Sequence, residues 1–136
     1  MIVANQKVSE HVYYSEVRCR CDRRGRRLCD GGHIRREVLD LFECIRARCS
    51  ERLGRDCPIQ ILSGVRCRLH NILVGGASKS QHICGMALDL KTPEGIGVEE
   101  FYSICEEEVG DGGLGRYDWG AHIDVCTDPP RRRWIG

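Results

Sequence analysis

The sequence contains no long apolar run and almost no excess charge, and each absence excludes a class of protein. No segment approaches the roughly 20 consecutive apolar residues that a transmembrane helix needs. The formal net charge is +1, so no overall field favours nucleic acid. We interpret the two local basic runs, at 23–27 and 131–133, as a solvated turn and a solvated tail. Neither a membrane-spanning protein nor a nucleic-acid-binding protein is therefore expected.

Cysteine, by contrast, is abundant, because the 136 residues include ten. A secreted scaffold could pair all ten, but such scaffolds are usually shorter and have a signal peptide. Residues 1–7 lack the apolar core and the cleavage site of such a signal. We therefore expect most of the cysteines to be reduced thiols, several of them buried. Cys19, Cys21 and Cys29 could form a thiolate metal cluster or a disulfide site, although they lack the paired CxxC spacing of a structural zinc site.

The chain length fits one domain over residues 1–136, with an irregular lead-in over 1–31. Apolar residues at helical spacing predict two amphipathic helices, and runs of branched residues bounded by Pro and Gly predict strands. The expected elements are a helix over 34–53 ended by Gly54, a strand over 58–63, a long loop over 64–80, a strand over 86–91, a helix over 98–109 and a hairpin of 114–117 with 121–126. This order predicts an α+β fold, a small antiparallel sheet with helices packed on one face.

Two segments contain residues suited to bind a metal ion. His82 and Asp89 lie seven residues apart with Gly85 between them, and imidazole and carboxylate are both good zinc ligands. In a strand, His122 and Asp124 share one face, so both can enter one polar site while their neighbours pack in the core. Three protein ligands would leave a fourth position for water, as in catalytic zinc sites. The alternative from spacing alone is that these histidines are satisfied loop and core residues.

Several blocks of the sequence, in order, resemble the zinc D-Ala-D-Ala carboxypeptidase-type peptidases of bacterial cell walls. The matching blocks are Ser63-Gly64-Val65-Arg66 with Asn71 and Gly75-Gly76, Ser80-x-His82-x-x-Gly85-x-Ala87-x-Asp89, Gly112-Gly113-Leu114-Gly115-Arg116-Tyr117, His122-Ile123-Asp124 and Arg133-Trp134. The resemblance implies a hedgehog/DD-peptidase-like fold. It also implies one zinc ion with His82, Asp89 and His122 as its ligands.

The resemblance also implies roles for other residues of the site. Arg66 matches the arginine that contacts the substrate or the transition state. Ser80, Asn71 and Tyr117 are expected to contact substrate, with a turn residue as the alternative for Ser80 and core packing as the alternative for Tyr117.

The residue that transfers the proton is less well defined by the sequence. Many relatives have an acid three residues before the last histidine ligand, and here that position is Trp119. We expect Asp124 to be the general base, with Asp118 as the second candidate. A further possibility is that Asp124 orients the site without accepting a proton.

The function that these expectations imply is a zinc metallopeptidase that hydrolyses an amide bond in the peptide part of peptidoglycan. We expect a monomer that is made in the cytoplasm without a signal peptide and acts on the cell wall, as a phage-type endolysin or as a chain whose leader is absent. Its partners would be peptidoglycan stem peptides. The alternative is a non-catalytic zinc-binding module that recognises wall peptides or a protein partner.

Overall fold

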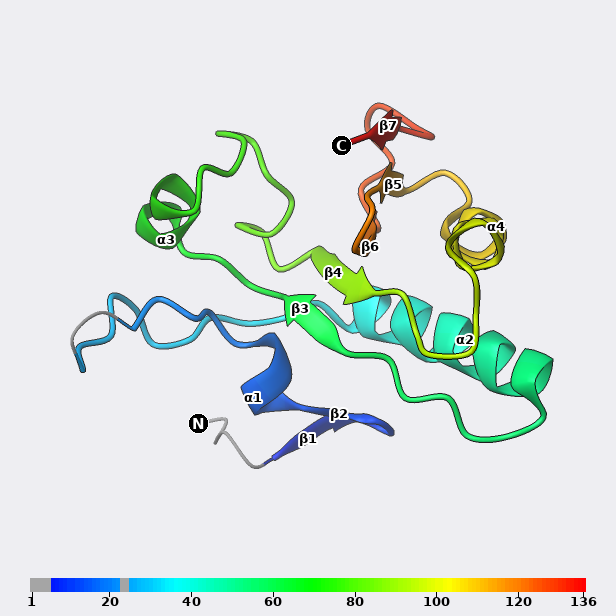
Figure 1. Ribbon diagram of the computed structural model, residues 1–136. Coiled ribbons are helices and arrows are strands. Elements are labelled where there is room, and N and C mark those ends of the chain that lie inside the picture. Colours follow the sequence, from blue (N-terminus) through cyan, green and yellow to red (C-terminus); the bar gives the residue numbers. More distant parts are fainter. Residues whose placement is uncertain (1–5, 23–24) are drawn as a thin grey trace.

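The structure is a computed structural model that describes residues 6–22 and 25–136, and it has an α+β architecture (Figure 1). Among these residues, no helix combines the length and apolarity that crossing a membrane requires. The helices are α1 (Tyr14–Val17), α2 (Arg36–Leu53), α3 (Arg68–Leu73) and α4 (Val98–Val109). The strands are β1 (Lys7–Ser9), β2 (Val12–Tyr13), β3 (Ile61–Ser63), β4 (Ala87–Lys91), β5 (Gly113–Arg116), β6 (Gly120–Asp124) and β7 (Arg133–Ile135).

The main sheet has five strands in the order β3-β4-β6-β5-β7. Its first three pairings are antiparallel, as predicted, but β7 pairs with β5 in parallel, so the prediction of an entirely antiparallel sheet is wrong at this edge. The interpretation of 131–133 as a solvated tail is also wrong in part. Arg133 opens β7 and binds Glu106 of α4, with 2.6 Å between Nε and Oε2. Backbone pairing and this ion pair hold the segment in place.

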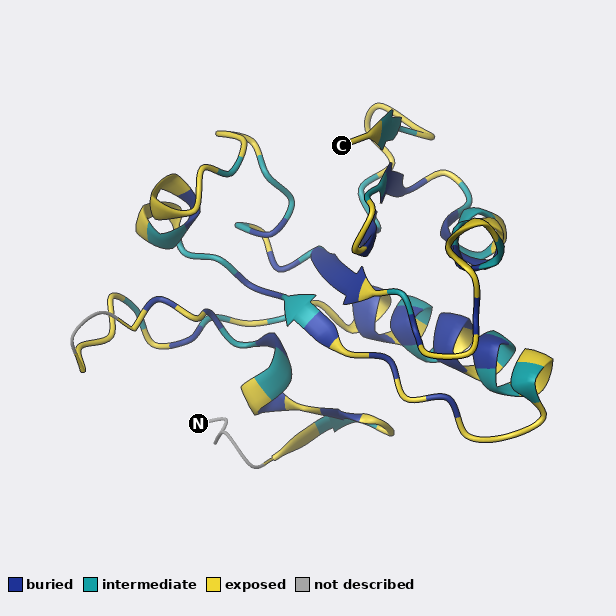
Figure 2. Cartoon of the chain, viewed as in Figure 1, coloured by how far each residue is buried: buried dark blue, intermediate teal, exposed yellow. Residues whose placement is uncertain are grey.

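The two faces of the sheet differ because side chains alternate along each strand. Leu88 and Leu90 of β4, Leu114 of β5 and Ile123 of β6 point to one face, where they pack in a single core with α2 and α4. Figure 2 shows α2 turning its buried residues toward the sheet. The helices therefore cover one face, as expected, and the alternate residues of the same strands are left for the opposite face.

The long helix begins near its expected start and ends at its expected residue. Its buried residues, Val38, Phe42, Ile45 and Cys49 among them, recur at helical spacing. Gly54 ends it in a left-handed conformation, at φ 68°, with its N–H bonded to the carbonyls of Glu51 and Ser50. Glycine adopts this conformation without the steric penalty that a Cβ brings.

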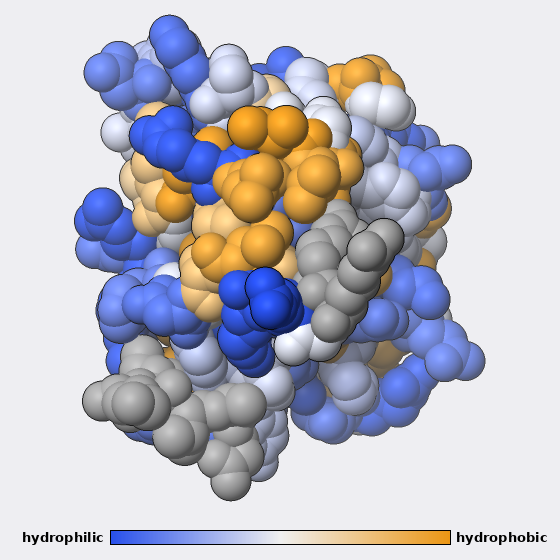
Figure 3. Space-filling view, turned by 90° about the vertical axis from the view of Figure 1, so that its left-hand side faces the viewer, coloured by the Kyte–Doolittle hydropathy of each residue, from blue (hydrophilic) through white to orange (hydrophobic). Residues whose placement is uncertain are grey.

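Four elements lie where the sequence predicted irregular chain. The lead-in contains the hairpin β1–β2 and the short helix α1, and the predicted loop over 64–80 contains α3. The helix α3 buries no apolar face, because Leu69, Ile72 and Leu73 are exposed. Figure 3 shows an exposed apolar patch on this side of the molecule. Its start is fixed instead by the Cys67 side chain, which accepts a hydrogen bond from the His70 N–H. Without an apolar face toward the core, α3 leaves little periodic signal in the sequence.

Glu43 of α2 joins the N-terminal hairpin to the domain. Its Oε2 accepts hydrogen bonds from the Ser9 hydroxyl at 2.6 Å and the His11 backbone N–H at 2.8 Å, and its Oε1 lies 2.7 Å from His11 Nδ1. Burial raises the pKa of Glu43, but the hydrogen bonds from Ser9 and His11 outweigh burial and lower it below the ordinary value. The charged carboxylate is therefore the form that binds the hairpin.

Replacing Glu43 with Gln should lower the free energy of unfolding by about 1–2 kcal/mol at neutral pH, because only one of the two oxygens remains as an acceptor. The folded-state pKa of Glu43 is depressed, so its contribution is full above the unfolded value of about 4.3 and is lost as pH falls through the folded value. Urea unfolding across this range measures both effects. Glu51→Gln, at an exposed position of the same helix, is the matched control. Equal losses in the two variants at neutral pH would contradict the role assigned to Glu43.

Candidate metal centre

Three side chains from two neighbouring strands and the loop before them converge on the face of the sheet that the helices leave open. Asp89 of β4 and His122 of β6 are directly opposite partners in the antiparallel register. His82 reaches them from the turn before β4, where Gly85 adopts φ 68°. Asp89 Oδ1 lies 3.1 Å from His82 Nε2 and 3.1 Å from His122 Nδ1. The three ligand atoms lie within 4.8 Å of one another, so one metal ion could contact all of them.

The orientation of both imidazole rings fits metal binding. His82 Nδ1 lies 2.7 Å from the Gly64 carbonyl, so this nitrogen donates a proton and Nε2 is left with its lone pair toward Asp89. His122 Nε2 lies 2.8 Å from Asp124 Oδ2, which leaves His122 Nδ1 as the nitrogen that faces Asp89. Metal-binding histidines characteristically use their second nitrogen in this way. The donor set and its hydrogen bonds therefore suit a divalent ion such as zinc.

The electrostatics of the site keep its carboxylates charged. Burial raises the pKa of Asp89, but hydrogen bonds and positive charge from His122 and His82 outweigh burial and hold the pKa well below its usual range. Burial likewise raises the pKa of Asp124, and His122 and Arg132 outweigh it and lower the pKa. Burial lowers the pKa of His122, whereas Asp124 and Asp89 outweigh burial and raise it. A metal cation held between the ligands would interact favourably with Asp89, as the positive charge of protonated His122 does without it.

Arg66 lies beside the ligands, at the end of the segment that follows β3. Its Nη2 is 3.2 Å from Asp89 Oδ2, the oxygen that faces away from the histidines. Its Nε donates to the Ser63 hydroxyl at 3.2 Å and its Nη1 to Asn71 Oδ1 at 3.4 Å. Asn71 is itself 2 % exposed and donates to the Ala77 carbonyl. Asn71 therefore holds Arg66 in place from behind.

Asp124 lies on the side of His122 that faces away from Asp89 and is completely buried. While Oδ2 contacts His122, Oδ1 accepts hydrogen bonds from the backbone N–H groups of Gly113 and Cys126 and pairs with Arg132. A Cβ at Gly113 would overlap the Asp124 carboxylate and the Arg132 guanidinium, which explains a glycine at this position of β5. The carboxylate is thus engaged on both oxygens.

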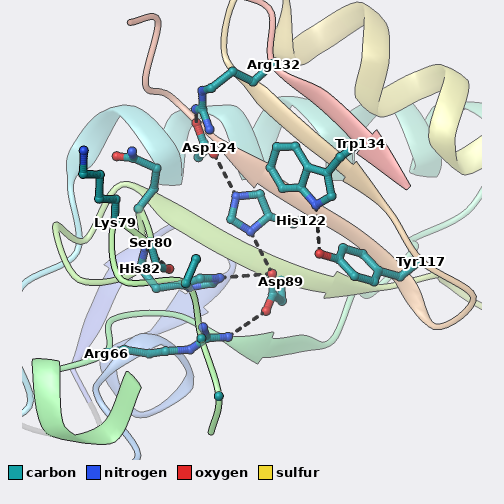
Figure 4. A pocket seen from close by; sticks show the side chains of 14 residues that line it. Arg66, Lys79, Ser80, His82, Asp89, Tyr117, His122, Asp124, Arg132 and Trp134 are labelled. Atoms are coloured by element: carbon teal, nitrogen blue, oxygen red, sulfur yellow. Dashed lines mark hydrogen bonds and ion pairs between the residues drawn. The ribbon is translucent and has the colours of Figure 1, made fainter. Parts of the chain in front are cut away.

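A cavity of about 340 Å³ opens over the three ligands (Figure 4). Arg66, Lys79 and Arg132 supply positive charge around it, and Ser80 lies beside His82, whose N–H bonds to the Ser80 hydroxyl. Tyr117 and Trp134 form its aromatic wall, joined by a 2.8 Å hydrogen bond from the indole N–H to the phenol oxygen. The Trp134 ring lies 5.0 Å from the His122 ring, centroid to centroid.

The close fit of Trp134 depends on a glycine. Trp134 pairs with Gly115 in the parallel register of β7 and β5, and a Cβ at Gly115 would overlap the indole ring. The GGxG block of the sequence therefore leaves room for two side chains of the site, Asp124 at Gly113 and Trp134 at Gly115.

The structure brings most of the residues expected at the site to the cavity, with two exceptions. His82, Asp89, His122, Arg66, Ser80, Tyr117 and Asp124 line it. Asn71 lies behind Arg66, and Asp118 is exposed on the β5–β6 turn, outside the cavity lining. Trp119, at the position where the resemblance implied an acid, stacks on Tyr117 with 4.5 Å between ring centroids.

Sequence reasoning missed Arg132, which binds Asp124 and lines the cavity. The run of arginines at 131–133 gave no signal that distinguished one of them. Only the pairing of β7 with β5 places Arg132 beside Gly113.

Comparison with known protein families identifies the class to which this site belongs. The family model for Peptidase M15 matches residues 10–125, which include the three candidate ligands. The chain therefore belongs to the Peptidase M15 family, and the resemblance seen in its motifs is confirmed. A comparison with curated proteins finds none that matches.

Replacing Asp124 with Asn should lower the affinity of the site for zinc by about 10–100-fold. Asparagine has one acceptor atom where Asp124 uses two oxygens, so either His122 or the group around Arg132 loses its partner. Zinc affinity is measured by competition with a chromophoric chelator. Asp118→Asn is the matched control, because Asp118 is exposed and lies outside the ligand set. The zinc affinity of this variant should equal that of the wild type. Unchanged affinity in Asp124→Asn would contradict the orienting role.

Proposed function

We propose that this protein is a zinc metallopeptidase that hydrolyses an amide bond in the peptide part of bacterial peptidoglycan. The observation that supports the proposal most directly is the convergence of His82 Nε2, His122 Nδ1 and Asp89 on one point at the floor of the cavity. Membership of the Peptidase M15 family supports the same reaction class. We further propose that the fold is of the hedgehog/DD-peptidase type and that the protein works as a monomer.

In this proposal His82, Asp89 and His122 hold one zinc ion. When bound, zinc supplies Lewis acidity, which lowers the pKa of water and polarises a carbonyl group. Three protein ligands leave a position open to the cavity, in keeping with a catalytic site. Arg66 contacts Oδ2 of Asp89, and Asp124 contacts Nε2 of His122. These two contacts hold both ligands in the orientation that metal binding needs.

The lining of the cavity suits a peptide that has free carboxylates. Arg66, Lys79 and Arg132 lie on its wall, and arginine binds carboxylates through two parallel hydrogen bonds. Tyr117 and Trp134 add apolar surface to the cavity for the side chains of small residues. Peptidoglycan stem peptides combine small residues with carboxylate groups, so they match both features. Ser80 has a hydroxyl at the rim that can contact the peptide backbone.

The contacts of the two candidate aspartates support one choice of the residue that transfers the proton. Asp124 is buried and bonded on both oxygens, which favours the orienting role over that of a base. We therefore propose Asp118, next to Tyr117 on the β5–β6 turn, as the residue that takes a proton from the attacking water and passes it to the leaving amine. Its exposed carboxylate is free to turn toward a bound peptide.

The proposal predicts that the purified zinc-loaded protein cleaves muropeptides and that mass spectrometry of the products identifies the bond. His122→Ala should abolish cleavage because it removes a ligand. Asp118→Asn should lower turnover by about 10²–10⁴-fold while zinc content stays unchanged.

Two outcomes would contradict parts of this account. Full turnover in Asp118→Asn would exclude Asp118 as the base. If the zinc-loaded wild type binds muropeptides without cleaving any of them, the non-catalytic module is supported instead. One observation favours that alternative: Asp89 and Asp124, the only described carboxylates that line the cavity, are both engaged.

A further inference from the structure

A second group of metal-binding side chains lies apart from the cavity, in the loop that follows α1. Cys19, Cys21 and Cys29 come from this loop, and Cys67 comes from the start of α3. Their four sulfur atoms lie within 4.8 Å of one another, and Cys21 Sγ and Cys29 Sγ are 3.4 Å apart. All four are free thiols in the structure. From these positions we infer that the four cysteines form a second, structural zinc site.

The spacing of the sulfurs fits a single ion. Zinc bonds of about 2.3 Å to four thiolates at the corners of a tetrahedron place the sulfurs about 3.8 Å apart. The 3.4 Å between Cys21 and Cys29 and the upper limit of 4.8 Å for the group lie on either side of this value, so small rotations of the side chains would complete the site. Clusters that contain several iron atoms hold their cysteine sulfurs further apart, because iron and sulfide lie between them. Four protein sulfurs also leave no position for water, which is the arrangement of a structural site.

The backbone around the cysteines supports thiolate ligands. Each sulfur accepts a hydrogen bond from a backbone N–H: Leu28 donates to Cys21 at 3.3 Å, Gly31 to Cys29 at 3.3 Å, Cys67 to Cys19 at 3.2 Å and His70 to Cys67 at 3.4 Å. Such donors stabilise negative charge on sulfur. If the four cysteines were neighbours in the core only by chance, there would be no reason for each sulfur to accept a backbone hydrogen bond.

A partly buried cation near the group, Arg18, supports a negative charge on the four sulfurs. Two guanidinium nitrogens of Arg18, Nε and Nη2, are buried and have no hydrogen-bond partner among the described residues. The Nε lies against Gly31, the residue whose N–H donates to Cys29. Buried polar atoms without a hydrogen-bond partner are costly. A zinc ion with four thiolates has net negative charge and would compensate Arg18.

The site would also explain how this part of the chain is held together. The small core at the loop contains Cys19, Cys21 and Val65, with Cys29, Ile34 and Cys67 packed against it, so most of its members are the cysteines themselves. A segment with so little apolar surface gains little from burial, and metal ligation then supplies the missing stability.

The position of Cys67 links this second site to the cavity. Cys67 directly follows Arg66, and the Val65 N–H bonds to the Val17 carbonyl at 2.8 Å. The ion would therefore fix the loop against the segment that places Arg66 beside Asp89.

The test is the metal content and the cobalt spectrum of the reduced full-length protein. The wild type should bind about two zinc ions per chain, and His122→Ala should bind about one. Cobalt in place of zinc in His122→Ala should give the intense sulfur-to-cobalt charge-transfer absorption that only thiolate ligands produce, because the His82 site has no sulfur ligand. The double variant Cys21→Ser with Cys29→Ser should lose this absorption and one equivalent of metal. The matched control is Cys44→Ser with Cys84→Ser, at two exposed cysteines outside the group, and it should behave as wild type.

Several results would overturn the inference. His122→Ala could bind no metal, or its cobalt spectrum could lack the charge-transfer absorption. Alkylation and mass spectrometry could find a disulfide within the group, or the protein as isolated could show iron bound to these cysteines. If the double cysteine variant does not fold, His122→Ala still decides the question, since its cysteine group is intact. If the His82 site does not bind metal, the cobalt-loaded wild type still shows the thiolate charge-transfer absorption. Failure of the proposed catalytic site is therefore distinguishable from failure of the cysteine site.

Discussion

The antiparallel pairing of β4 with β6 is the constraint on which the rest of the site depends. It sets Asp89 directly opposite His122, and the alternation of the same strands sends Leu88, Leu90 and Ile123 into the core beneath α2 and α4. A shift of this register by one residue would exchange the core face for the site face. The packing of the helices therefore fixes which residues meet at the cavity. Asp89 is the centre of the arrangement, with both histidines on one oxygen and Arg66 on the other.

The features that sequence analysis predicted correctly are those encoded over short distances. The helical spacing of apolar residues between Ile34 and Leu53 and the glycine at position 54 predicted α2 almost to its ends. The alternation around His122 predicted the two faces of β6. The ordered blocks of motifs then selected one family, which the family model confirms. The candidate ligands could be named because His82 and Asp89 lie within one such block.

The features that the sequence did not reveal depend on contacts between distant segments. The helix α3 exposes its apolar residues, so no periodic pattern marks it. The edge strand β7 and the role of Arg132 arise only because the chain returns beside β5. Cys67 joins Cys19 across 48 positions of the chain, so spacing near Cys19 showed three of the four sulfurs and no complete ligand set. For Asp124 the sequence left two roles open, general base and orienting residue, and we propose the orienting role because the carboxylate is buried and engaged on both oxygens.

The most direct test of the central claim is an anomalous-scattering experiment at the zinc absorption edge on crystals of the zinc-loaded protein. The account predicts a peak at the floor of the cavity, bounded by Asp89 and by two specified nitrogens, Nε2 of His82 and Nδ1 of His122, because Gly64 and Asp124 occupy the other nitrogen of each ring. A zinc-loaded crystal without a peak at this point, or with the ion bound through Nε2 of His122, would contradict it.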